Sequence, residues 1–313
     1  MITPDSAAPG GRAAPDPDGG KGAWDRVVVI FNPNSTGDAP GLAEELRADL
    51  LQRLPALPVE LQPTEHAGHA RTLARVAAEQ GRPLIISVSG DGGYNEVVNG
   101  IMDAGTPQVT AAVLAAGNAN DHRRVTREHS LPEAVALAQV TRLDLLRLEI
   151  ERDAGTQIRY AHSYIGVGLT PVVAVELEKG SKGSLRELGT VLRTFRKFRP
   201  FEIETADGKR QLIDSVLFAN IPEMAKVLTL SQNGAPDDGR FEIVLIPHRP
   251  KWRVLATAFR AATSGLGRQP SARLYRFTAR TAMPLQIDGE VMELEAGDRI
   301  QVRLDPGALA TIT

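Results

Sequence analysis

The feature that most constrains the fold is a regular alternation of strand-like and helix-like patterns between residues 24 and 143. The runs RVVVIF, PLIISVS and VTAAVLAAG are almost wholly apolar, which is typical of strands buried on both faces of a sheet. Each run leads into a polar loop that contains glycine, and helical spacing follows the first two loops. Repeated strand–helix units predict a mostly parallel α/β sheet that binds ligands beyond the carboxyl ends of its strands.

Beyond residue 143 the pattern changes to runs that alternate apolar and polar residues, such as QLIDSVLFANI and GRFEIVLIP. This alternation indicates antiparallel strands with one buried face. Two helical stretches interrupt these strands, near Ser184–Phe198 and Lys251–Thr263. The sequence therefore predicts a disordered tail (1–23), an α/β domain (24–141) to which a last strand could return from the C-terminus, and a β-rich antiparallel domain (142–313).

Composition excludes several classes of protein. The net charge of −2 over 313 residues argues against a nucleic-acid-binding protein, which usually has a clearly basic domain. The absence of cysteine excludes disulfides and thiolate metal sites. No run approaches the roughly 20 apolar residues needed to span a bilayer, and the tail lacks the apolar core of a signal peptide. We therefore expect a cytoplasmic protein that at most lies on a membrane surface.

The loop SGDGGYNEVVNG, Ser89–Gly100, predicts an anion site. It matches neither common phosphate motif, because a G-x-G-x-x-G pattern would need glycine at Asn95 and no G-x-x-x-x-G-K-[ST] occurs. A strand, a glycine turn and a helix N-terminus nevertheless direct N–H groups toward an anion. Asp91 fits such a loop if the anion arrives with Mg²⁺, which binds carboxylate and phosphate oxygens together. The loop thus favours Mg·ATP over bare phosphate, and the alternative is an ordinary surface turn.

The segment QIDGE is the candidate for acid–base chemistry. In an extended strand, Asp288 and Glu290 would point to the same face, with Gly289 leaving room between them. One carboxylate could then accept the proton of a substrate hydroxyl while the other orients it. The alternative is the polar end of a hairpin.

These segments together resemble the catalytic domain of diacylglycerol kinases and sphingosine kinases, including bacterial lipid kinases. SGDGGYNEVVNGI resembles the family signature GGDGTxNEVxNGL, and FNPNSTG resembles the loop after its first strand. PTEHAGHARTLA, AAGNANDHRR, RLDLLRL, GAPDDGRFEIVLI and LQIDGEV resemble further family segments. They occur in family order from about residue 26 to residue 295, and this order makes the resemblance specific.

The resemblance implies a lipid kinase that transfers the γ-phosphoryl group of Mg·ATP to the free hydroxyl of a diacylglycerol-like or sphingoid lipid. It implies that the second domain holds the lipid and that Glu290 and Asp288 supply the general base. It also implies a Mg²⁺ site at Asp238, with main-chain oxygens near Ala235 and Arg240. The residues expected at the nucleotide are Asn32, Pro33, Asn34, Ser35, Thr36, Thr64, Ser89, Gly90, Asp91, Gly92, Gly93, Tyr94, Asn95, Glu96, Asn118, Asn120 and Asp121.

The sequence also departs from the family pattern. Gly93 stands where threonine is usual, Ser89 replaces the first glycine, and Asn118 replaces a threonine. In the second domain, Ser163 and Thr170 stand where asparagine and aspartate are usual. Two alternatives therefore remain open: a non-catalytic kinase-like protein that binds a nucleotide or lipid, and a kinase for a soluble hydroxyl substrate.

A basic amphipathic pattern suggests peripheral contact with an anionic membrane. An apolar stripe at helical spacing lies among basic residues, an arrangement that can rest on anionic lipid. The alternative is that the stripe packs on the β-rich domain. The apolar residues are Leu185, Leu188, Leu192 and Phe195, and the basic residues are Arg186, Arg193, Arg196, Lys197 and Arg199.

Overall fold

The computed structural model describes most of both predicted domains. The described residues are 22–35, 37–116, 129–168, 200–224, 228–229, 234–250 and 266–312. The predicted tail up to residue 21, both predicted helices of the second domain, the basic stripe, and Thr36, Asn118, Asn120 and Asp121 lie outside these residues.

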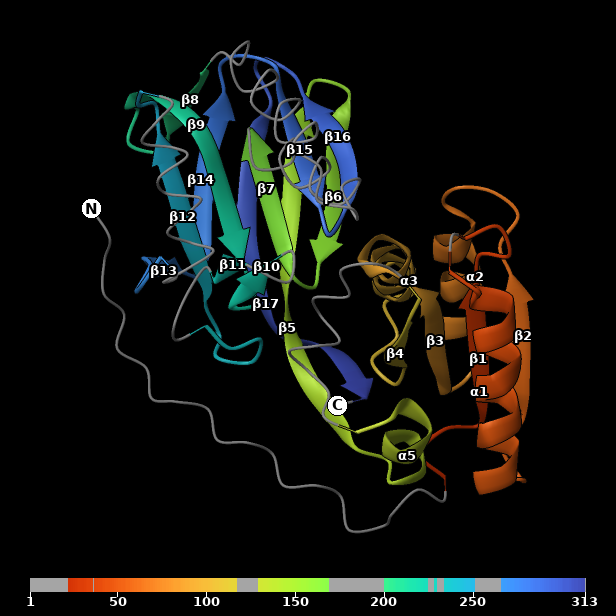
Figure 1. The fold of residues 1–313 in the computed structure, drawn as a ribbon. Helices are drawn as coiled ribbons and strands as arrows, with labels where there is room; N and C mark the ends of the chain where they lie inside the picture. The colour runs from red at the N-terminus through yellow and green to blue at the C-terminus, as the bar shows by residue number, and fades with distance from the viewer. Residues whose placement is uncertain are drawn as a thin grey trace, which may run out of the picture.

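The N-terminal domain contains a parallel sheet of the predicted kind (Figure 1). Its first four strands are β1 (Arg26–Phe31), β2 (Val59–Pro63), β3 (Pro83–Ser89) and β4 (Thr110–Ala115). They are parallel and lie in the order β2-β1-β3-β4. The chain passes from β1 to β2 and then returns to the other side of β1 as β3. The strand order therefore reverses between β1 and β3, and open α/β sheets bind ligands at such a reversal.

Helices cover both faces of this parallel sheet (Figure 1). They are α1 (Ala39–Arg53), α2 (His69–Ala78), α3 (Asp91–Ala104) and α5 (Leu131–Ala136). Residues of α1 and α5 share one buried cluster with alternate strand residues such as Val29 and Ile86. Residues of α2 and α3 share another cluster with the intervening residues, such as Val28 and Ile85. Burial on both faces explains why these strands are continuous apolar runs.

The helix α3 forms where the sequence predicts it. Val97, Val98 and Ile101 are buried against the sheet, and Met102 packs beside them half-buried. The helix ends at Gly105, which adopts the left-handed conformation usual for a terminating glycine. A Cβ atom on Gly100 would lie 2.2 Å from the carbonyl oxygen of Arg71, so glycine permits α2 and α3 to pack closely.

The second domain is built from antiparallel strands, in agreement with the predicted fold class. The strands are β5 (Val140–Arg152), β6 (Gly155–Ala161), β7 (Tyr164–Gly168), β8 (Phe201–Thr205), β9 (Arg210–Ala219), β10 (Glu223–Met224), β11 (Leu228–Thr229), β12 (Phe241–Pro247), β13 (Ser271–Ala272), β14 (Leu274–Ala279), β15 (Met283–Ile287), β16 (Glu290–Leu294) and β17 (Arg299–Ile312). One apolar core, which includes Phe218, Phe241 and Ile300, contains residues of ten of these strands, β5 to β9, β12 and β14 to β17.

Two long strands connect the domains. β5 and β17 pair from Glu151 and Arg299 at one end to Val140 and Ile312 at the other. The last residues of β17 also pair in parallel with β4, so the C-terminal strand extends the N-terminal sheet. The predicted domain boundary at residues 141 and 142 falls inside β5, and a single sheet runs through both domains.

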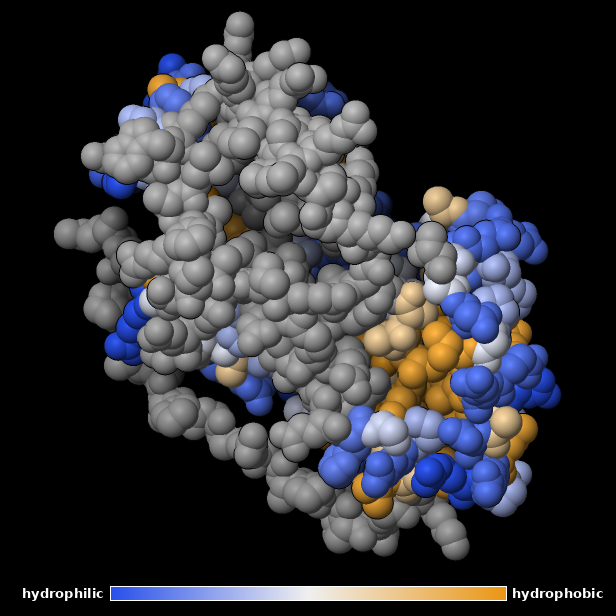
Figure 2. All heavy atoms as spheres, viewed as in Figure 1, coloured by the Kyte–Doolittle hydropathy of each residue, from blue (hydrophilic) through white to orange (hydrophobic). Residues whose placement is uncertain are grey.

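On the face of the N-terminal domain that Figure 2 shows, hydrophilic residues border a broad apolar area. None of the helices in the described part of the chain is long and apolar enough to cross a membrane.

Candidate functional site

The parallel sheet brings the predicted loops to one edge. Asn32 closes a turn after β1, since its Oδ1 accepts a hydrogen bond from Asn34 N at 2.9 Å. A Cβ on Gly37 would lie 2.5 Å from the carbonyl oxygen of Ala116, so the loop after β1 touches the end of β4. Thr64 follows β2, and its N–H donates to the carbonyl of Phe31 at 2.8 Å. The loops after β1, β2 and β4 therefore lie beside the loop after β3.

The loop after β3 presents the start of a helix to this edge. Gly90 is extended and precedes the first residue of α3, and no side chain caps the helix there. The N–H groups of a first helical turn have no acceptor within the helix, and the helix dipole adds partial positive charge. The backbone at Gly92 and Gly93 therefore has the form of an anion site, and the carboxylate of Asp91 lies in the same turn.

The next three residues make contacts inside the protein. Tyr94 is fully buried in the core of the N-terminal domain, and its hydroxyl lies 3.3 Å from Thr311 Oγ1. Asn95 is buried and donates to the carbonyl of Tyr160 at 2.8 Å. Glu96 accepts a hydrogen bond from Gly68 N at the start of α2, at 3.2 Å. Part of the GGDG-like motif thus joins α3 to its neighbours, a role that the sequence did not indicate.

The prediction that Asp288 and Glu290 share one face of an extended strand is wrong. Ile287 and Glu290 pair across the β15–β16 hairpin, and Asp288 and Gly289 form its two-residue turn. Both turn residues have positive φ, 45° for Asp288 and 96° for Gly289. Asp-Gly is a favoured pair for this turn, because its twist matches that of the flanking strands. The hairpin alternative was the correct one for the backbone.

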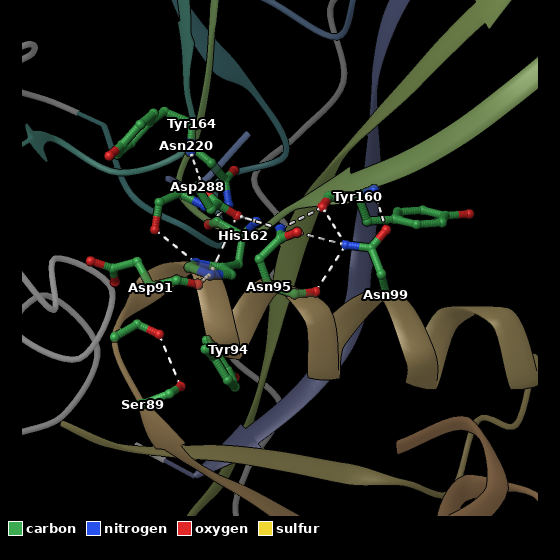
Figure 3. Close-up of polar contacts among 12 residues, drawn as sticks. Ser89, Asp91, Tyr94, Asn95, Asn99, Tyr160, His162, Tyr164, Asn220 and Asp288 are labelled. Carbon is green, nitrogen blue, oxygen red and sulfur yellow. Dashed lines mark hydrogen bonds and ion pairs between the residues drawn. The ribbon is translucent and has the colours of Figure 1, made fainter. Parts of the chain in front are cut away.

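The carboxylate of Asp288 is fully buried and accepts four hydrogen bonds (Figure 3). Its Oδ1 accepts from Ser163 N at 3.0 Å and Tyr164 N at 2.9 Å. Its Oδ2 accepts from His162 N at 2.7 Å and Asn95 Nδ2 at 2.9 Å. Burial raises the pKa of Asp288 to about 7, and the hydrogen bonds oppose that shift. Asp288 thus joins α3, the β6–β7 connection and the β15–β16 turn.

His162 lies beside this carboxylate and was not identified from the sequence. Its Nε2 is 3.3 Å from Asp288 Oδ2 and 3.4 Å from the carbonyl oxygen of Asp91. Its Nδ1 is 2.8 Å from Ser163 Oγ, and its ring lies 4.8 Å from the ring of Tyr94. Burial lowers the pKa of His162 to about 3, so the imidazole is neutral. The sequence feature that could have identified His162 is a His-Ser pair within the strand pattern YAHSYIGVG.

A second asparagine strengthens the contact between α3 and β6. Asn99 donates through Nδ2 to the carbonyl of Tyr160 at 2.9 Å and accepts from Tyr160 N at 2.9 Å. Its side chain therefore satisfies both main-chain groups of Tyr160, as a neighbouring strand would. On the other side of the site, Asn220 donates to the carbonyl of His162 at 3.1 Å.

The β15–β16 turn lies against the first turn of α3. A Cβ on Gly92 would lie 3.7 Å from the carbonyl oxygen of Asp288, and a Cβ on Gly289 would lie 3.7 Å from Gly92 N. Glu290, the next residue, is exposed. The negative charges of Glu290 and Glu96 help to raise the pKa of Arg71, after the larger effect of Asp103. An accessible carboxylate and a buried one therefore flank Gly289.

The predicted Mg²⁺ residues lie together in the loop before β12. Asp238 N donates to the carbonyl of Ala235 at 3.4 Å, and Asp238 Oδ1 accepts from Arg240 N at 2.9 Å. Burial raises the pKa of Asp238, and the nearby charges of Asp144 and Asp237 raise it further. This excess of negative charge fits a cation. Within the described residues no three His, Asp or Glu side chains converge on one point, so main-chain oxygens would have to complete a metal site.

These features define a two-domain protein: an open α/β sheet whose loops meet at one edge, and an antiparallel β domain that contributes a buried acid there. The family model for the diacylglycerol kinase catalytic domain matches residues 26–149. This part of the chain is therefore similar to the catalytic domain of diacylglycerol kinases.

Two curated proteins are similar to the chain over most of its length. The chain is 27% identical to a Bacillus subtilis protein named "Putative lipid kinase YtlR", over 73% of this chain and 82% of the relative. It is also 27% identical to the diacylglycerol kinase of Bacillus subtilis, over 88% of this chain and 93% of that protein.

A solved structure shares the whole fold. The crystal structure of "a putative diacylglycerol kinase from Bacillus anthracis str. Sterne" superposes with a TM-score of 0.69 at 21% identity, covering 92% of this chain and 97% of that chain. Yeast NADH kinase superposes less closely, with a TM-score of 0.51 at 13% identity, over 96% of this chain and 87% of that chain.

Proposed function

We propose that the protein is an ATP-dependent lipid kinase that transfers the γ-phosphoryl group of Mg·ATP to a lipid hydroxyl. The observation that carries the proposal is the contact between the first turn of α3 and the β15–β16 turn, which brings the backbone at Gly92 next to Asp288 and Gly289, the residues that precede Glu290. A phosphoryl donor at the helix and an acceptor hydroxyl at the hairpin would then meet between the domains.

The N-terminal domain would bind the nucleotide. Main-chain N–H groups at Gly92 and Gly93 would hold phosphate oxygens, and the loops Asn32–Ser35 and Thr64 border the same edge. The carboxylate of Asp91 would face the Mg²⁺ that accompanies ATP. When bound, that ion would neutralise the charge of the phosphates, and the protein would mainly position the two reactants.

Glu290 is the better candidate for proton acceptor, and Asp288 for the residue that positions it. Glu290 is exposed and can meet a substrate, whereas Asp288 is fully buried and holds four donors. Asp288 holds the turn in place, and Glu290 is the first residue of β16 after that turn. Because positioned proton transfer is typically worth ~10²–10⁴-fold in rate, Glu290 would make a modest addition to the larger effects of alignment and charge.

The loop with Asp238 would hold a structural Mg²⁺. The unfavourable charge of Asp238 beside Asp144 supports a cation there. Peripheral binding of a cytoplasmic protein to anionic membrane, which would give access to the lipid, completes the proposal. The basic stripe that motivates it lies outside the described residues.

The first experiment incubates the purified protein with Mg·[γ-³²P]ATP and extracted lipids. Label in the organic phase supports the proposal, and label only on a water-soluble acceptor supports a kinase for a soluble substrate. The fold shared with yeast NADH kinase is the observation that keeps the second function as a candidate. Absence of label from both phases would leave a non-catalytic binding protein.

A substitution then tests the assignment of the proton acceptor. Glu290→Gln keeps the size of the side chain and removes its charge, so kcat should fall at least about a hundredfold while KM for ATP changes much less. Glu293→Gln is the matched control, because Glu293 is another exposed glutamate on β16. A folded Glu290→Gln variant with the kcat of the wild type would show that Glu290 does not accept the proton.

A further inference from the structure

His162 has contacts that the proposed chemistry does not require. The residue lies in the connection between β6 and β7, is fully buried, and belongs to the second domain. Its contacts include the main chain of Asp91, the first residue of α3, and the carboxylate of Asp288 in the β15–β16 turn.

One nitrogen of His162 faces the nucleotide side of the site (Figure 3). Nε2 lies 3.4 Å from the carbonyl oxygen of Asp91 and 3.3 Å from Asp288 Oδ2. Both of these neighbours are acceptors, so in the neutral imidazole Nε2 carries the proton and donates it. A single N–H group therefore reaches the first residue of α3 in one domain and the turn aspartate in the other.

The other nitrogen fixes the orientation of the ring. With Nε2 protonated, Nδ1 is an acceptor, and the hydroxyl of Ser163 donates to it at 2.8 Å. The main-chain N–H of His162 also donates to Asp288 Oδ2 at 2.7 Å. The ring packs on Tyr94, with 4.8 Å between centroids. The imidazole therefore has little freedom to rotate, and its Nε2 remains directed at Asp91 and Asp288.

We propose that His162 is a positioning residue that sets the distance between the first turn of α3 and the Asp288 turn. By holding these two elements together, it keeps the nucleotide backbone of one domain aligned with the acceptor side of the other. The inference rests on the proposed function for its catalytic consequence, but the positioning itself can be measured without activity.

A simple packing role predicts something different. If the ring only filled space against Tyr94, phenylalanine would replace it without loss, because a buried polar group costs free energy that a phenyl ring does not. The imidazole is instead satisfied at both nitrogens, which a phenyl ring cannot reproduce. The comparison of His162→Phe with polar replacements therefore separates packing from positioning.

The experiment compares three variants of the full-length protein. His162→Phe keeps the ring and removes both hydrogen bonds, so kcat should fall about 10–100-fold, with KM for ATP changed less than about threefold. His162→Gln places an amide donor at about the reach of Nε2 and should recover most of the loss. His162→Asn is shorter, reaches only about as far as Nδ1, and should recover little.

His248→Phe provides the control. His248 is also a histidine bonded to a carboxylate, Asp214, at 2.9 Å, but its side chain is 44% exposed and it lies outside the site. This variant should keep the kcat of the wild type. If folded His162→Phe also keeps the wild-type kcat, or if Gln recovers no more than Asn, the positioning role is refuted.

Amide hydrogen exchange supplies a readout that does not depend on activity. His162→Phe should increase exchange in the peptides around Gly92 and Gly289 at least about tenfold, and His248→Phe should not. Unchanged exchange would refute the inference even if the protein phosphorylates lipid. If exchange increases in His162→Phe but the wild-type protein labels no lipid, the positioning role is supported and the proposed function fails.

Discussion

Gly93 shows how tightly the residues at the start of α3 constrain one another. A Cβ on Gly93 would lie 2.7 Å from Ser89 Cβ and 2.8 Å from Ser89 Oγ, closer than such atoms approach in proteins. Gly93 lies in α3 and has no positive φ that would itself require glycine. The two departures from the family motif, serine for glycine and glycine for threonine, are therefore sterically linked: a threonine at 93 requires a smaller residue at 89.

We expect Gly93→Thr alone to lower the free energy of unfolding by about 1–3 kcal/mol, because the new side chain overlaps Ser89. Adding Ser89→Gly should restore most of that loss, which urea unfolding of the wild type, both single variants and the double variant would measure as a coupling energy. Gly92→Ala is a control, since a Cβ there meets only the Asp288 carbonyl oxygen at 3.7 Å. Purely additive effects would contradict the steric link.

The crossing of β5 and β17 between the domains depends on one buried aspartate. Asp144 accepts from Gly307 N and from Gly239 N, both at 2.8 Å. The first donor belongs to the irregularity in β17 between Asp305 and Leu309, and the second to the loop that carries Asp238. The main-chain carbonyl of Asp144 also accepts from Asn220 Nδ2 at 2.8 Å. Asp144 therefore holds together the segments that surround the domain junction.

We expect Asp144→Ala to destabilise the protein, because it leaves two N–H groups without their acceptor at about 1–3 kcal/mol each. Asp144→Asn should cost less, since its single amide oxygen can still accept. Asp153→Ala, at an exposed position beside the same strand, should change stability by less than about 0.5 kcal/mol. Chemical unfolding monitored by circular dichroism would reveal the order, and equal stability of the two alanine variants would contradict the role of Asp144.

Stability of the whole protein should depend on pH through groups of opposite sign. Burial lowers the pKa of His162 to about 3, so its contribution is complete above its unfolded pKa of about 6.5 and is lost as pH falls toward 3. Burial, with a smaller effect of the Asp238 charge, raises the pKa of Glu242 to about 7. The contribution of Glu242 is complete below its unfolded pKa of about 4.3 and is lost as pH rises through 7.

Burial also raises the pKa of Asp288 to about 7, so Asp288 acts in the same direction as Glu242. Between about pH 4.3 and pH 6.5 the two acids therefore oppose His162, each group contributing up to about 1.4 kcal/mol per pH unit, and we expect stability to fall as pH rises through this range. His162→Phe should make this fall steeper, and Glu242→Gln should make it flatter. Urea unfolding at pH 4 to 8 would measure both slopes. A slope that is unchanged in the folded His162→Phe variant would show that His162 does not titrate on unfolding.

Local patterns in the sequence determined the main elements. Continuous apolar runs predicted β1, β3 and β4, and the glycine turn after β3 predicted the start of the helix α3. Because parallel strands direct their carboxyl ends to one edge, the sequence also predicted that the loops at Asn32, Thr64 and Ser89 would gather. The positions of these elements depend on the periodicity of apolar residues, and the gathering of the loops depends on strands that run in the same direction. Both can be inferred from the order of residues in the sequence.

Tertiary structure alone decided how the site is assembled. The backbone of His162 and the carboxylate of Asp288 are 126 residues apart in the chain, yet they form a hydrogen bond of 2.7 Å. The same holds for Asn95 and Asp288, which are separated by 193 residues. No spacing rule relates such residues, because their proximity depends on how β5 and β17 orient the domains. The burial of Asp288 and the role of His162 follow from that orientation, since a side chain becomes buried only through the segments that pack around it.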